Sequence, residues 1–91
     1  MNGLWGKYRG TVVDNVDPLR MGRLQALVPS VFGEVASGWA MPCVPYVDPP
    51  TRYRLLPPVD AAVWIEFEEG DVAQPIWSGC FWGEGEWPAE A

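Results

Sequence analysis

Apolar and polar residues alternate most clearly between positions 63 and 68. Apolar side chains occupy every second position, at Val63, Ile65 and Phe67, and the residues between them, beginning with Trp64, face the other way. A period of two is typical of a strand with one buried face. Residues 69–71 (Glu-Gly-Asp) then provide the turn residues that close a hairpin. We therefore predict that the three alternating apolar residues belong to the core.

The second arm of this hairpin, residues 76–82, is apolar on both of its predicted faces. Strict alternation places Trp77 and Phe81 on one face and Ile76 and Cys80 on the other. A strand buried on one side only needs no such pattern. The sequence therefore predicts either a strand in the middle of a small barrel or a strand whose outer face another chain covers.

The first third of the chain is typical of another hairpin. Residues 5–16 predict a long strand, and residues 23–29 predict its return, with Leu24, Ala26 and Val28 facing inward. Residues 17–22 (Asp-Pro-Leu-Arg-Met-Gly) contain the Pro and Gly of a turn. Gly10, inside the first strand, indicates a sharp bend or a close approach of two backbones.

The middle of the chain carries weaker strand signals. Residues 38–47 predict a third strand, but two prolines within it remove donors from the ladder, so it is predicted to be an edge or interrupted strand. We expect a loop over residues 30–37, with its Val-Phe-Gly segment packed as a lid, and an extended loop over 48–60. Residues 84–91 predict a short, flexible acidic tail.

These elements together predict an all-β fold with little or no helix. Five short strands separated by Gly- and Pro-rich turns favour a small five-stranded OB-type Greek-key barrel. An SH3-like barrel is the alternative for a chain of this size. We expect one domain, the barrel spanning residues 1–83 and the tail spanning 84–91.

Composition narrows the classes of partner. The chain has six Trp, more than a small core holds, so we expect some of them to face a partner protein. Its net charge of −6 disfavours binding to phosphate backbones and to anionic membranes. No signal peptide or membrane span is visible in the sequence, so we expect synthesis in the cytoplasm and no membrane anchoring.

The sequence offers few groups for catalysis or metal binding. It contains no His, and its two cysteines, Cys43 and Cys80, lack metal-binding spacing. We expect free, buried thiols and neither a metal nor a cofactor. An enzyme would have to use carboxylates such as Glu66 and Glu68, but carboxylates on an outward strand face are usually solvated or paired with cations. The sequence therefore predicts a protein without enzymatic activity.

Several motifs, in order along nearly the whole chain, resemble the OB-fold baseplate and spike proteins of contractile injection systems, including the phage baseplate assembly protein V family and type VI spike proteins. The Asp-Pro…Gly-Arg turn and the Phe-Glu-x-Gly-Asp…Pro hairpin are the most specific of them. The matching segments are residues 8–15, 17–18, 22–24, 39–46, 56–59, 63–71 and 75–80. The sequence departs from the family pattern within the 48–60 loop.

This resemblance implies a structural adaptor of the central spike in a contractile, phage-tail-like particle. Family members are typically trimeric and join a hub protein to a needle, so we expect a homotrimer in the particle, a hub partner and a separate needle or tip protein. The candidate interface residues are Trp64, Trp77, Phe81, Trp82 and Trp87. The OB shape leaves a second hypothesis open, a binding module for single-stranded nucleic acid or oligosaccharide, although the few basic residues disfavour nucleic acid.

Overall fold

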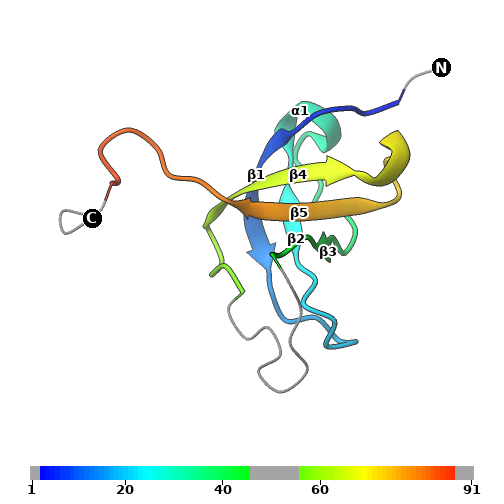
Figure 1. Ribbon diagram of the computed structural model, residues 1–91, viewed down its shortest axis with the longest axis horizontal. Coiled ribbons are helices and arrows are strands. Elements are labelled where there is room, and N and C mark those ends of the chain that lie inside the picture. The colour runs from blue at the N-terminus through cyan, green and yellow to red at the C-terminus, as the bar shows by residue number, and fades with distance from the viewer. Residues whose placement is uncertain (1–2, 46–55, 88–91) are drawn as a thin grey trace.

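The computed structural model describes residues 3–45 and 56–87, and within them the fold is built almost entirely from strands (Figure 1). One turn of helix, α1 (Pro29–Phe32), and one 3₁₀ turn, η1 (Glu68–Gly70), accompany them. The strands are β1 (Tyr8–Asp14), β2 (Gln25–Leu27), β3 (Met41–Pro42), β4 (Ala62–Phe67) and β5 (Pro75–Cys80). The predicted all-β class with five strands is confirmed.

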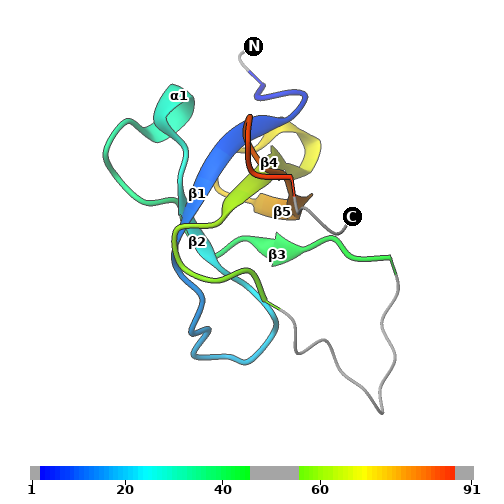
Figure 2. The same cartoon turned by 90° about the vertical axis from the view of Figure 1, so that its left-hand side faces the viewer.

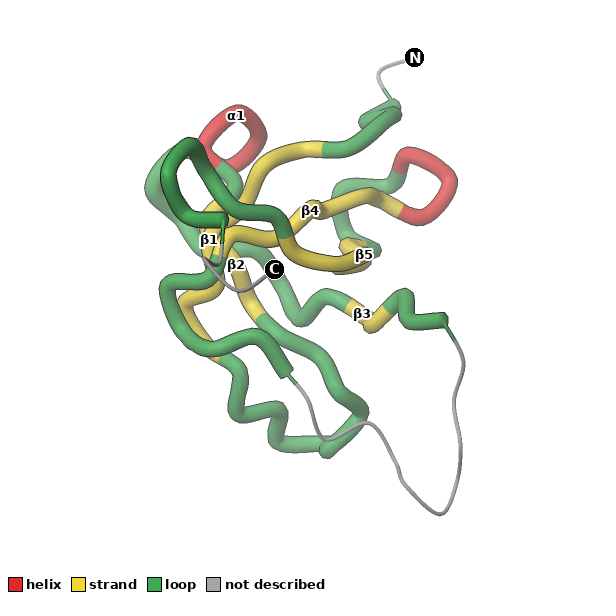
Figure 3. Tube along the Cα trace, turned by 60° about the vertical axis from the view of Figure 1, so that its left-hand side comes forward, coloured by secondary structure: helices red, strands yellow, loops and turns green. Residues whose placement is uncertain are grey.

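The strands form one curled sheet in the order β2-β1-β4-β5-β3 (Figures 1 and 2). All neighbours are antiparallel except β3 and β5, which run parallel. The two edges of the sheet meet where Leu24 and Ala40 form an isolated bridge, with N···O distances of 3.2 and 2.7 Å. Figure 3 shows the resulting curl of the sheet around its interior. This order, with the parallel β3–β5 pair, is the OB-type Greek key that the sequence predicts.

The core lies inside the curl and receives its side chains from alternate positions of β1, β2, β4 and β5. Val63, Ile65 and Phe67 are 0%, 0% and 5% exposed, which confirms the predicted inner face of β4. The remaining buried apolar residues are Val12, Leu24, Ala26, Val28, Ala40 and Trp77. The ring of Phe67 makes edge contacts with Tyr8 and Phe32, at centroid distances of 5.7 and 6.0 Å. Phe32 on α1 thereby closes one end of the barrel.

Gly10 allows the closest approach between strands. A Cβ atom at this position would lie 3.0 Å from Cγ1 of Ile65 and 3.3 Å from the carbonyl oxygen of Leu27. The predicted close approach is therefore confirmed, since any side chain at this position would push β1 away from its neighbours. The strand itself is shorter than the predicted 5–16 and spans Tyr8–Asp14.

A bulge in β5 overturns the predicted facing of its second half. Ile65 pairs with Trp77, but Val63 pairs with Cys80 instead of Gly79, so β5 contains one extra residue. Gly79, with a φ of 118°, absorbs the bend. The extra residue inverts the alternation that follows it. Trp77 and Phe81, predicted on one face, therefore lie on opposite faces, and so do Ile76 and Cys80.

The third strand is the least regular element. Only Met41 and Pro42 pair with β5, in place of the predicted 38–47, because a proline cannot donate to a ladder. Its position at the end of the sheet order confirms the predicted edge strand. Residues 30–37 contain the end of α1, a short helix that the sequence analysis did not predict. Of the predicted 48–60 loop, residues 48–55 lie outside the described residues.

Candidate protein interface

The outer surface of β1, β4 and β5 carries a stack of one cation and two aromatic rings. Arg9 on β1 is paired in register with Trp64 on β4, and its guanidinium carbon lies 5.4 Å from the centroid of Trp64. The same carbon lies 4.9 Å from the centroid of Phe81. The rings of Trp64 and Phe81 are 4.3 Å apart at an angle of 33°. We call Arg9, Trp64 and Phe81 the outer stack.

This stack depends on the β5 bulge. Without the extra residue at Gly79, Phe81 would project to the same side as Trp77 and could not reach Trp64. Cation–π contacts and offset ring contacts are both favourable, so the three side chains hold one another in place on the surface. The outcome is a rigid, largely apolar surface with one positive charge.

Two further tryptophans lie just beyond β5. Trp82 and Trp87 make an edge-to-face contact with a centroid distance of 4.8 Å. A turn at Gly83–Glu86 brings them together, with the amide of Glu86 donating to the carbonyl of Gly83 at 3.1 Å. Both side chains stay largely exposed, at 52% and 60%. Figure 1 shows this segment leaving the barrel after β5.

Trp77, the fifth predicted interface residue, belongs to the core instead. It is 5% exposed, and its indole Nε1–H donates to the carbonyl oxygen of Gly22 at 3.0 Å. A buried Trp needs a partner for this N–H, and the loop between β1 and β2 provides one. Trp77 is therefore not accessible to a partner. The surface candidates are Trp64, Phe81, Trp82 and Trp87, and sequence reasoning missed Arg9, whose place opposite Trp64 only the strand register reveals.

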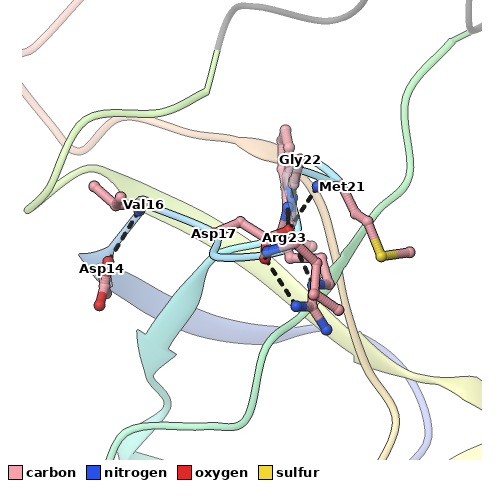
Figure 4. A network of polar contacts seen from close by, with 8 residues as sticks. Asp14, Val16, Asp17, Met21, Gly22 and Arg23 are labelled. Carbon is pink, nitrogen blue, oxygen red and sulfur yellow. Dashed lines mark hydrogen bonds and ion pairs between the residues drawn. The ribbon is translucent and has the colours of Figure 1, made fainter.

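The same loop is organised around Asp17, which is 8% exposed (Figure 4). Its carboxylate accepts bonds from Nε and Nη2 of Arg23, at 3.0 and 2.8 Å. It also accepts the backbone N–H groups of Leu19, Met21 and Arg23. The bonds from Arg23, followed by those backbone groups, hold the pKa of Asp17 well below its usual range, although burial opposes them. The Asp-Pro…Gly-Arg motif is thus a rigid turn.

The carboxylates considered for catalysis do not form an acid–base pair. Glu66 forms an ion pair with Lys7 at 3.2 Å, and Glu68 is exposed where β4 ends. Within residues 3–45 and 56–87, no group of three or more potential metal ligands is present. Both cysteines are free, as predicted, but they are exposed and not buried. They line a hollow of about 480 Å³ beside the β3–β5 edge, where the shortness of β3 leaves them uncovered.

Comparison with known proteins identifies the barrel. Residues 8–82 match the family model of the type VI secretion system/phage-baseplate injector OB domain. No curated protein matches the chain. The matched segment includes the outer stack, the Asp17 turn and Trp82. In the described part of the chain, no helix is long and apolar enough to cross a membrane.

Proposed function

Because the chain belongs to the type VI secretion system/phage-baseplate injector OB domain family, we propose that it is a structural adaptor of the central spike, without enzymatic activity. In this role three copies join a hub protein to a separate needle or tip protein. The chain is made in the cytoplasm and then becomes part of the particle. Residues 1–83 form the adaptor barrel, and residues 84–91 form a tail beside the interface.

The observation that supports this role is the exposed aromatic surface next to β5. The outer stack and the Trp82–Trp87 pair follow one another along the chain and consist of ordered, contacting rings. Aromatic and Arg side chains are the residues that contribute most to protein–protein affinity. A large exposed aromatic surface is an aggregation hazard unless a partner covers it. We therefore assign this surface to the contact with the hub protein.

The charges of this surface favour a protein partner over nucleic acid. Arg9 is held by two rings, and Lys7 is paired with Glu66. The chain as a whole carries −6. Single-stranded nucleic acid needs stacking rings beside a positive groove, and the outer face provides the rings without that groove. Fluorescence titration with a labelled oligonucleotide at low salt should show no saturable binding.

The test uses the hub protein encoded by the neighbouring gene. Co-expression of the two chains, followed by light scattering, should give a complex with a multiple of three adaptor chains. Trp64→Ala combined with Phe81→Ala should weaken hub binding by about 30-fold or more, since truncating an interface anchor costs about 2 kcal/mol or more. Trp5→Ala is the matched control, because Trp5 is also exposed, at 65%, but lies outside the outer stack.

Two results would contradict the proposal. One is a hub that assembles into complete particles after deletion of this gene. The other is a double variant that folds normally, by circular dichroism, and still binds the hub with unchanged affinity.

A further inference from the structure

The Asp17 turn presents two exposed apolar side chains in a fixed position. Leu19 and Met21 are 64% and 46% exposed, while their backbone N–H groups are bound by the Asp17 carboxylate at 2.9 and 2.8 Å. The Trp77 bond to Gly22 fixes the end of the turn on the barrel. A loop that is already ordered loses little conformational entropy on binding. We call residues 19–21 the apolar knob.

A positive charge lies at the centre of this knob. Arg20 is exposed, with a φ of 55°, and forms no ion pair with any carboxylate in the described ranges. The described cations Lys7, Arg9 and Arg23 all have a partner, either a carboxylate or aromatic rings. A partner of the knob should therefore offer an apolar surface bordered by a carboxylate.

A hollow of that kind lies at η1, where the N-terminal segment packs against the turn. It has a volume of about 570 Å³ and is lined by Leu4, Val31 and Val72, with Glu69 and Asp71 beside them. The bond from the amide of Leu4 to the carbonyl of Gly70, at 3.0 Å, holds its two sides together. Its volume falls within the range of about 300–1,000 Å³ for binding pockets, so two side chains can enter it.

The knob and the hollow cannot meet within one copy. In Figure 1 the β1–β2 loop lies at the bottom of the barrel, and η1 lies at its upper right. Their chemistry is complementary, apolar with a central cation on one side and apolar with bordering carboxylates on the other. A membrane surface would not match the knob, because an anionic bilayer repels a chain of net charge −6.

We infer that the knob of one copy docks into the η1 hollow of a second copy of this chain. Leu19 and Met21 fill the hollow, and Arg20 pairs with Glu69. Because the two surfaces differ, the contact is heterologous, as every contact in a closed ring of three must be. The inference rests on the proposed assembly of several copies and names the contact between them.

Charge reversal tests this contact in the full chain. Arg20→Glu and Glu69→Lys should each weaken self-association by about 10-fold or more in sedimentation velocity, whether of the chain alone or of its complex with the hub, since reversal replaces attraction with repulsion. The Arg20→Glu/Glu69→Lys double variant should recover association. Both sites are exposed, and neither side chain donates or accepts a bond within the described structure, so the variants should fold normally.

Glu84→Lys is the control for net charge, because it makes the same change as Glu69→Lys at another exposed site. Leu19→Ser should weaken association without any change in charge. The inference is overturned if wild type binds the hub as one copy and stays monomeric alone. It is equally overturned if association survives both single reversals, or if the double variant fails to recover. Hub binding itself tests the proposed function, so a normal hub complex with a different contact between copies would sink only this inference.

Discussion

Replacing Phe67 with Asp should abolish the fold. Phe67 is 5% exposed and belongs to the core cluster between β4 and α1. Its ring makes edge contacts with Tyr8 and Phe32 at 5.7 and 6.0 Å. An Asp at this position would lose those contacts and would place a carboxylate among apolar side chains.

The magnitude follows from two costs. Truncation of a buried Phe costs about 3–5 kcal/mol through lost burial and the cavity left behind. Burial of an unpaired carboxylate adds several kcal/mol, because water is removed from the charge and nothing replaces it. A domain of this length has a total stability of about 5–14 kcal/mol. The sum is therefore comparable with the whole free energy of unfolding.

Urea titration followed by circular dichroism and Trp fluorescence measures this directly. Wild type should unfold in one cooperative transition, and Phe67→Asp should show no folded baseline at neutral pH. Phe67→Leu is the control, since it keeps an apolar side chain and should unfold cooperatively at a lower midpoint. A Phe67→Asp protein with a cooperative transition near that of wild type would refute the placement of this side chain in the core.

Three further predictions concern the turn, the bulge and the thiols. The pKa of Asp17 is depressed in the folded state, so its charge stabilises the fold above the ordinary Asp pKa of about 3.9 and this contribution is lost as the pH falls below that value. Asp17→Asn should therefore lower the melting temperature at pH 7, and its difference from wild type should shrink in acid; a constant difference would contradict this. Gly79→Val should destabilise the domain and disturb the outer stack, because Gly79 has a φ of 118° that a β-branched residue disfavours, while Val59→Ala at an exposed site is the control; unchanged melting would argue against the bulge. The native protein should react with two equivalents of a thiol reagent per chain without denaturant, since Cys43 and Cys80 are exposed, and a count of zero would contradict this.

Local signals predicted most of the barrel. The strict alternation in β4 gave the buried set Val63, Ile65 and Phe67, because a regular strand turns every second side chain the same way. The same reasoning placed Leu24, Ala26 and Val28 inside. The Asp-Pro…Gly-Arg motif predicted the turn between β1 and β2, although not the five bonds that converge on the Asp17 carboxylate.

The candidate interface depended on information that alternation does not contain. A single extra residue at Gly79 reverses the facing of everything after it in β5, which put Trp77 in the core and Phe81 against Trp64. The sequence by itself determined which strands exist and which residues of β1, β2 and β4 are buried, since those strands are regular where their core residues lie. Only the tertiary structure decided the outer stack and the pairing of Trp82 with Trp87, because strand register and a bulge, set by contacts between distant segments, fix which side chains meet.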